Sequence, residues 1–214
     1  MSWIRTIPYE RAEGSLRALY DRVRGPAGDI DNILLLHGLR PHTLQGHMTL
    51  YKNVLHHSGN RLPKWLLEMI GVYVSLLNRC DYCADHHFVG LRRLLADDDR
   101  AERIRVALER DADRGPMEED SWAADSASGA LGPRELAALR YARTLTLKPW
   151  EVAEASVAAL RKTGLEDGEI LEINQVVAYF AYANRTVLGL GATTEGDVLG
   201  LSPGDGGPGD WCHG

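Results

Sequence analysis

The sequence predicts an all-α protein that folds as one compact multi-helix domain. Helical periodicity runs through almost the whole chain, and no segment alternates apolar and polar residues as a half-buried strand does. Apolar residues make up 44% of the 214 residues and charged residues 25%, which is typical of globular proteins. We therefore expect a single domain over 1–201, built from roughly seven to nine helices, and a flexible Gly- and Pro-rich tail over 202–214.

The first helices are expected before residue 61. Residues 9–24 carry apolar side chains at helical spacing, and the Gly-Pro pair that follows ends the run. A short helix is expected in the stretch DNILLLHGL. Pro41 then fits the first turn of a helix over 41–57, which the following Ser-Gly-Asn closes.

The longest apolar helix is expected from Pro63 to about Leu77, followed by a corner at residues 78–79 and a second helix over 81–95. An acidic surface connection is expected over residues 113–133. The remaining helices are expected over 97–113, 133–149, 150–164 and 167–191.

Composition and charge exclude several classes of protein. The net charge of -6 and the absence of a clustered basic face argue against nucleic-acid binding. The N-terminus lacks the apolar stretch of a secretion signal, and no window approaches the roughly eighteen apolar residues of a membrane span. We therefore expect a cytoplasmic protein, in which a close cysteine pair is catalytic or metal-binding rather than a permanent disulfide. Cys212, in the tail, is assigned no role.

The stretch NRCDYCADHH places a Cys-x-x-Cys pair and two histidines at the start of the 81–95 helix. Cys83 and His87 are four residues apart, so the imidazole lies one turn from the thiol on the same face. Cys80 and Cys83 both lie at the N-terminal end, where unpaired N–H groups and the helix dipole favour a thiolate. This spacing predicts a nucleophilic thiol beside a base.

Glu68 is a carboxylate within an otherwise apolar helix. It lies about ten residues before the 78–79 corner and His87 about eight after it, roughly 15 and 12 Å from the bend. An antiparallel hairpin therefore brings the two side chains to a similar height. We expect Glu68 to orient or deprotonate His87, which activates Cys83, with Cys80 as a second sulfur able to form a disulfide.

Two other interpretations of this cluster stay open. Four side chains are potential zinc ligands, although structural zinc sites usually draw ligand pairs from separate segments, and adjacent histidines on a helix point about 100° apart. Each residue also has an ordinary structural interpretation, with Glu68 as a helix carboxylate, His86 as a packing residue and Tyr82 as a cover over the cysteines. The potential ligands are Cys80, Cys83, His86 and His87, and the histidines assigned no chemistry are His37, His42, His47, His56 and His57.

A loose internal symmetry relates two apolar helices. If LLEMIGVYVSLLNRC is laid on ILEINQVVAYFAYAN, Glu68 aligns with Glu172 and Cys80 with Asn184. One interpretation is a degenerate duplication of a helical hairpin, in which the first copy kept the sulfur chemistry. The other is the chance similarity of two amphipathic helices.

The order Glu68, Cys80, Cys83 and His87 resembles the active-site signature of the alkylhydroperoxidase D-like branch of the carboxymuconolactone decarboxylase superfamily. SWIRTIP, DNILLLHGLRP, LYKNVLHHS, VSLLNRCDYCADHH and LRKTGLEDGEILEINQVVAYFAYANR are similar, in the same order, to the uncharacterised peroxidase-related enzymes of that superfamily. The resemblance covers nearly the whole chain except the acidic connection and the tail.

This resemblance implies an all-helical fold and a thiol peroxidase or disulfide reductase activity that needs no metal, haem or flavin. It assigns the attack on the peroxide to Cys83, the resolution of its sulfenic acid to Cys80, and the proton relay to Glu68 and His87. The chain departs from the pattern at Tyr82, where the best-studied hydroperoxidases have a histidine. The decarboxylase branch lacks the cysteine pair, so its activity on a lactone acid is the weaker alternative.

The resemblance also implies a set of partners. We expect a hydroperoxide substrate, a dithiol, thioredoxin-like or lipoyl electron donor, and a homo-oligomer. A function of another class stays open, namely a redox sensor whose disulfide changes its assembly with little bulk peroxidase activity. Asn184 and Arg185 match a recurrent pair in these relatives and are assigned no chemistry.

Overall fold

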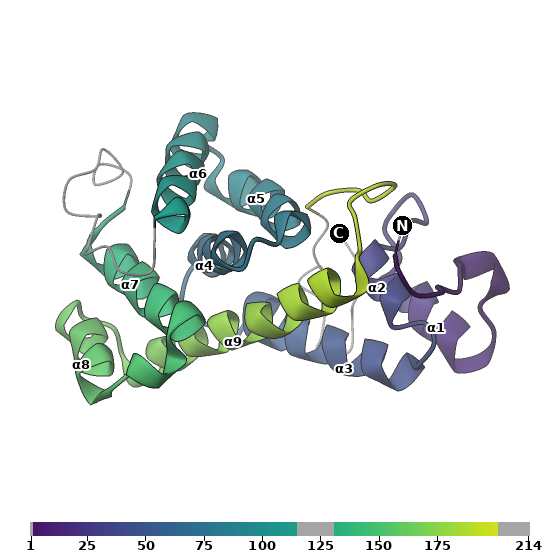
Figure 1. Cartoon of the computed structure of the whole chain (residues 1–214), viewed down its shortest axis with the longest axis horizontal. Helices are drawn as coiled ribbons and strands as arrows, with labels where there is room; N and C mark the ends of the chain where they lie inside the picture. The colour runs from purple at the N-terminus through teal and green to yellow at the C-terminus, as the bar shows by residue number, and fades with distance from the viewer. Residues whose placement is uncertain (1, 115–130, 201–214) are drawn as a thin grey trace.

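The computed structural model describes residues 2–114 and 131–200, in which all regular structure is helical (Figure 1). The all-α prediction is confirmed. Within the described part of the chain, no helix has the length and apolarity of a membrane span. The 202–214 tail, Cys212 and most of the acidic connection lie outside the described residues. The α-helices are α1 (Gly14–Val23), α2 (Asn32–Leu36), α3 (Pro41–Tyr51), α4 (Lys64–Leu77), α5 (Asp81–Leu95), α6 (Asp98–Asp113), α7 (Pro133–Leu147), α8 (Glu154–Lys162) and α9 (Asp167–Leu190).

Helix α4 lies in the middle of the molecule, with α5, α6, α7 and α9 packed against it (Figure 1). Eleven of its 14 residues are buried, as expected for a helix that is apolar on nearly every side. Gly71 lets α9 come close, since a Cβ there would lie 2.2 Å from the ring of Phe180. Helix α4 is therefore a tightly packed support for Glu68, its one buried carboxylate.

The corner between α4 and α5 lies at the predicted residues 78–79. Arg79 has a left-handed φ of 58°, which is unusual for a residue with a side chain. The Cys80 amide donates to the Ser75 carbonyl at 2.9 Å, and Cys80 becomes the N-cap residue of α5. The bounds of α5 also agree with the prediction.

Helix α3 differs from its prediction at its C-terminal end. A regular helix was expected over 41–57. The α-helix instead ends at Tyr51, and the chain continues as a π-helical turn over Lys52–His56. The Asn60 side chain donates to the Val54 carbonyl at 2.9 Å, which satisfies a group at this irregular end. The turn buries the His56 side chain within 3.8 Å of the Glu68 carboxylate. Such turns are frequent at functional sites.

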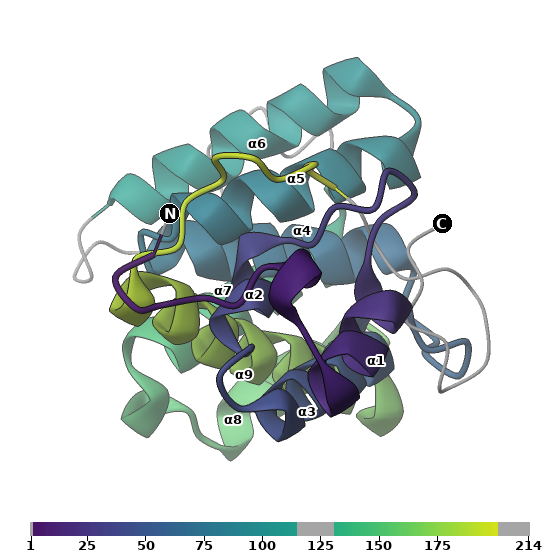
Figure 2. The same ribbon diagram turned by 90° about the vertical axis from the view of Figure 1, so that its right-hand side faces the viewer.

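After α9 the chain turns back at Gly191, whose φ of 67° ends the helix in the left-handed conformation. Residues 191–200, called here the C-terminal segment, then run across α5 (Figure 2). Gly200 packs on α5 so closely that a Cβ would lie 2.4 Å from Val89 Cγ1. The last described residues of the chain therefore cover the helix that carries the cysteine pair.

Candidate active site

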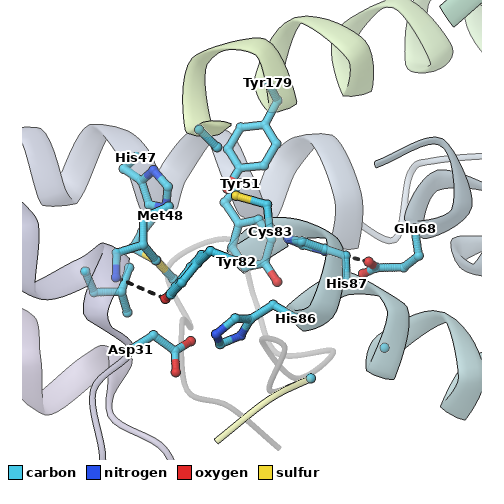
Figure 3. Close-up of a pocket in the computed structure, with 15 residues that line it drawn as sticks. Asp31, His47, Met48, Tyr51, Glu68, Tyr82, Cys83, His86, His87 and Tyr179 are labelled. Atoms are coloured by element: carbon cyan, nitrogen blue, oxygen red, sulfur yellow. Dashed lines mark hydrogen bonds and ion pairs between the residues drawn. The ribbon is translucent and has the colours of Figure 1, made fainter. Parts of the chain in front are cut away.

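A cavity of about 50 Å³ lies where α2, α3, α4, α5, α9 and the C-terminal segment meet (Figure 3). Space of this size holds a few water-sized groups. Six of its fifteen lining residues carry rings, so a bound group contacts several aromatic side chains. The rings belong to His47, Tyr51, Tyr82, His86, His87 and Tyr179.

Glu68 of α4 and His87 of α5 meet in this cavity, with 2.6 Å between Oε2 and Nδ1 (Figure 3). Burial alone raises the pKa of Glu68. The charge and hydrogen bond of His87, followed by the charges of His56 and Arg93, outweigh burial and hold this pKa below its usual value. A carboxylate that stays ionised fixes the orientation of the imidazole. The hairpin thus brings together the two side chains whose heights were matched by residue counting.

Both cysteines are buried thiols at the start of α5, with exposed fractions of 1% for Cys80 and 3% for Cys83. Cys83 lines the cavity, whereas Cys80 does not, and Figure 3 shows the Cys83 sulfur directed toward the ring of Tyr179. Cys80 lies in a small apolar cluster with Val187 of α9. Of the two sulfurs, Cys83 is the one that a small molecule in the cavity meets.

The pKa values of the two thiols move in opposite directions. A hydrogen bond between the thiols lowers the pKa of Cys80 and, together with burial and the Cys80 charge, raises the pKa of Cys83. The sequence predicted that the helix N-terminus would favour a thiolate at both positions, and the structure differs for Cys83. The physical reason is that two adjacent sulfurs share one proton, so the charge on one opposes ionisation of the other.

Asn184 of α9 contacts this sulfur pair. Its hydrogen bonding adds to the lowering of the pKa of Cys80 and opposes, without cancelling, the rise in the pKa of Cys83. Asn184 is fully buried, and its amide donates to the Ser75 hydroxyl at 3.1 Å and accepts from the Asn78 amide at 3.0 Å. These bonds fix the amide beside the sulfurs. Sequence reasoning assigned Asn184 no chemistry, although the loose symmetry had aligned it with Cys80.

His87 and Cys83 project into the cavity from successive turns of α5. The His87 ring packs edge-on against Phe180, with 4.6 Å between ring centroids, and against Tyr51 at 6.1 Å. Together with the Glu68 hydrogen bond, these contacts restrict the ring to one orientation. A small ligand in the cavity can therefore contact a thiol and an oriented imidazole at once.

Tyr82 and His86 belong to a second polar cluster, which joins α5 to the C-terminal segment. The Tyr82 hydroxyl donates to Asp197 Oδ2 at 2.6 Å and accepts from the Ile33 amide at 3.1 Å. His86 Nε2 lies 3.2 Å from the same Asp197 oxygen. Tyr82 therefore does more than cover the cysteines, and His86 is a buried partner of a carboxylate.

The two adjacent histidines thus contact different carboxylates, His86 that of Asp197 and His87 that of Glu68. Within residues 2–114 and 131–200, no three side chains of His, Cys, Asp or Glu converge as they would around a metal ion. The zinc interpretation of Cys80, Cys83, His86 and His87 gains no support from this arrangement.

Two histidines without assigned chemistry lie at or beside the site. His47 of α3 lines the cavity, and burial lowers its pKa to about 3, so its ring is neutral. His56 lies beside Glu68 on the π-helical turn. No spacing signal could have found either, because α3 and the turn reach α4 and α5 through tertiary packing.

The part of the chain that carries this site is similar to a known protein family. Residues 41–126, which include Glu68, both cysteines of the pair and His87, match the carboxymuconolactone decarboxylase family. No curated protein matches the sequence at a significant level.

Solved structures with the same fold cover most of the chain. An alkylhydroperoxidase AhpD core protein from Ralstonia eutropha JMP134, an uncharacterized peroxidase-related protein, is 24% identical with a TM-score of 0.72, over 90% of this chain and 91% of that chain. An uncharacterized peroxidase-related protein from Silicibacter sp. TM1040 is 22% identical with a TM-score of 0.67, over 89% and 87%. A variant of the debrominase Bmp8 in complex with 2,3,4-tribromopyrrole is 16% identical with a TM-score of 0.62, over 85% and 84%. The chain therefore has the all-helical AhpD-core fold, and its residues 41–126 are similar to the carboxymuconolactone decarboxylase family.

Proposed function

We propose that this protein is a thiol-dependent peroxidase of the alkyl hydroperoxide reductase type. The observation that carries the proposal is the arrangement of one small cavity, in which the Cys83 sulfur and the Glu68–His87 hydrogen bond lie on the same wall. Cys80 does not line the cavity but hydrogen-bonds to Cys83. A nucleophile, a base and a second thiol are the groups that a disulfide-forming peroxidase requires.

The cycle begins when the thiol pair loses a proton to His87, whose imidazolium Glu68 stabilises. The negative charge rests first on Cys80, whose pKa is lowered. Transfer of the remaining proton from Cys83 to Cys80 along their hydrogen bond then places the charge on Cys83, the sulfur that faces the cavity. Cys83 attacks the peroxide and becomes a sulfenic acid. Cys80 then attacks that sulfur, water leaves, and a Cys80–Cys83 disulfide forms.

Reduction of the disulfide completes the cycle. We propose a dithiol as the electron donor, from a small molecule, a thioredoxin-like protein or a lipoyl group, because each forms a mixed disulfide by the same exchange. Assembly as a homo-oligomer is proposed on the resemblance alone.

The test is a count of free thiols in the native protein before and after one equivalent of cumene hydroperoxide. Mass spectrometry locates any new bond. The proposal expects the rapid loss of two thiols as a Cys80–Cys83 disulfide, which a dithiol restores. No change at either cysteine would remove peroxidase activity from consideration.

A redox sensor is the second candidate, and the near-complete burial of both sulfurs favours it. Restricted access slows bulk turnover but still allows a disulfide to form. The discriminating measurement compares the oligomer size of reduced and oxidised protein while peroxide turnover is followed. A change of size with negligible turnover supports the sensor, and steady turnover without a change of size supports the peroxidase.

A further inference from the structure

Across the cavity from Glu68 and His87 lies the carboxyl group of Asp31 (Figure 3). Asp31 lines the cavity and is 9% exposed. Its Oδ1 is buried and has no hydrogen-bond partner in the part of the chain that the structure describes. Burying a carboxyl oxygen without a partner is costly, so such a group calls for an explanation in the chemistry of the site.

Asp31 lies at the start of α2, where its side chain would ordinarily find a hydrogen-bond partner. Asp31 is the N-cap residue of α2, where an aspartate normally accepts a backbone N–H, yet its side chain makes no capping bond. The carboxylate of Asp197 accepts the Asn32 N–H instead, with both oxygens at 3.1 Å. The C-terminal segment thus supplies an acceptor at the start of α2, and the Asp31 carboxyl group is left to the cavity.

We propose that Asp31 is the general acid of this site and donates a proton to the oxygen that leaves when Cys83 attacks a hydroperoxide. The proposal rests on the peroxidase activity proposed above. It assigns a second acid-base group to the cavity, on the wall away from the Glu68–His87 pair.

The substrate of this step is an alkyl hydroperoxide. The Cys83 thiolate attacks the oxygen that carries the hydrogen, and a sulfur–oxygen bond forms as the oxygen–oxygen bond breaks. The electron pair of the broken bond stays on the alkoxide, which takes the proton of Asp31 and leaves as an alcohol. Cys83 is then a sulfenic acid, and the Asp31 carboxylate regains a proton from water.

The charge state of Asp31 suits this role. Burial raises the pKa of Asp31 to about 7; the charge of His86 opposes the shift, and the charges of Asp197 and Asp29 add to it. Near neutral pH a large fraction of Asp31 is protonated, whereas the lowered pKa of Glu68 keeps that carboxylate ionised. Two carboxyl groups whose pKa values move apart within one site are the pattern of an acid and a base. The titratable groups that face Asp31 are Asp29 on its own loop, Tyr51 on α3, Tyr82 and His86 on α5, and Asp197 on the C-terminal segment.

The proposal predicts which substrates depend on Asp31. An alkyl hydroperoxide leaves as an alkoxide, a strong base that requires a proton as it departs. A peroxy acid leaves as a carboxylate, a weak base that requires none. The acid should therefore matter for the first class of oxidant and hardly at all for the second.

The test measures the single-turnover rate of Cys83 oxidation in the full-length protein, with cumene hydroperoxide and with peroxybenzoic acid. Both oxidants carry one phenyl ring, so they differ mainly in the leaving group. Asp31→Asn should slow the reaction with cumene hydroperoxide by roughly 100-fold and the reaction with peroxybenzoic acid by less than about threefold. In wild type the cumene hydroperoxide rate should fall as the pH rises through about 7, and Asp31→Asn should lose this fall.

Two further variants separate chemistry from structure. Asp29→Asn removes a neighbouring carboxylate that does not line the cavity, and it should keep both the rate and the fall at high pH. Asp31→Glu restores a carboxyl group and should recover a pH-dependent acid step, even if the Asn variant proves poorly folded.

Equal slowing with both oxidants, or no slowing with either, would overturn the role of Asp31 while leaving the peroxidase proposal intact. Failure of both oxidants to react with wild-type Cys83 would instead overturn the peroxidase proposal, and the acid role with it.

Discussion

The cavity wall that carries Cys83 comes from one continuous hairpin, whereas the opposite wall is assembled from segments far apart in the sequence. Glu68 and His87 are 19 residues apart and hydrogen-bond across the α4–α5 corner. Asn32, next to Asp31, bonds to Asp197, 165 residues along the chain. The first wall needs only two helices and a turn, while the second requires the whole domain to fold.

The two walls also differ in the charges that surround their carboxyl groups. Glu68 has His87 at 2.6 Å and the nearby charges of His56 and Arg93, so its charge is compensated. Asp31 has carboxylates of Asp29 and Asp197 around it, and only His86 opposes them. The hairpin wall is thus built to hold a negative charge, and the assembled wall to hold a proton.

Among the variants that test this difference between the walls, loss of the nucleophile should have the largest effect on peroxide-dependent thiol oxidation. Cys83→Ser should abolish peroxide-dependent thiol oxidation, because the remaining sulfur of Cys80 does not line the cavity. Cys80→Ser, the matched control, should still consume one equivalent of peroxide and leave a sulfenic acid on Cys83, detected by mass spectrometry. Peroxide consumption retained by Cys83→Ser would show that the chemistry does not belong to this wall.

Removal of the Glu68 charge should have the next largest effect. Glu68→Gln should slow Cys83 oxidation by roughly 100-fold, because His87 loses the carboxylate that orients it and stabilises its charged form. Stopped-flow measurement of thiol loss gives this rate.

Glu172→Gln on α9 is the matched control, since Glu172 accepts the Arg61 and Leu62 amides at 2.9 Å each and does not line the cavity. It should lower the free energy of unfolding by about 1 kcal/mol and leave the oxidation rate unchanged. Similar slowing in both variants would indicate a general loss of packing.

The dependence of stability on pH should distinguish the two carboxyl groups. Because the folded pKa of Asp31 is raised to about 7, ionisation of Asp31 opposes folding progressively from its unfolded value near 4 up to about 7. Asp31→Asn should therefore be more stable than wild type at pH 8, by roughly 2 to 4 kcal/mol, and this gain should shrink as the pH falls toward 5. Urea denaturation at several pH values measures it.

Glu68 should show the opposite sign. Its folded pKa is lowered, so its contribution to stability is present above its unfolded pKa and is lost as the pH falls through the folded value. Glu68→Gln should consequently lose stability relative to wild type at neutral pH. The difference in stability between Asp31→Asn and wild type should therefore vary with pH. A constant difference would contradict the opposite pKa shifts assigned to the two walls.

The smallest predicted effect lies at the hairpin corner. Arg79 has a φ of 58°, and its side chain is 68% exposed in an ion pair with Asp113. Arg79→Gly relieves the strain of a left-handed residue and loses only an exposed ion pair, so it should stabilise the protein by less than about 1 kcal/mol. Thermal unfolding measures the change, and a loss of stability in Arg79→Gly would assign the corner an additional role.

The hairpin wall could be predicted from the sequence because its geometry follows from helical rise and one turn. Counting residues from the 78–79 corner was sufficient to pair Glu68 with His87. The partners of Tyr82 and His86 could not be found in this way, because Asp197 lies more than 100 residues away from both and outside any periodic pattern.

Other differences depend on details that spacing does not contain. The raised pKa of Cys83 reflects burial and the neighbouring sulfur, which outweigh the helix terminus. The π-helical turn at Lys52–His56 depends on how the end of α3 packs and on the bond from Asn60. The resemblance indicated the fold, but the position of His56 beside Glu68 needed the structure.

The bonds from Asp197 to the start of α2 and to α5 have a consequence for the order of synthesis. A chain leaving the ribosome completes α4 and α5 more than 100 residues before Asp197 is added, at about 5 to 20 residues per second. For several seconds the cysteine pair exists without the segment that later covers its helix. A newly made molecule is therefore more accessible to bulky thiol reagents than its finished form, in which both sulfurs are buried. Pulse labelling of nascent chains would detect that interval.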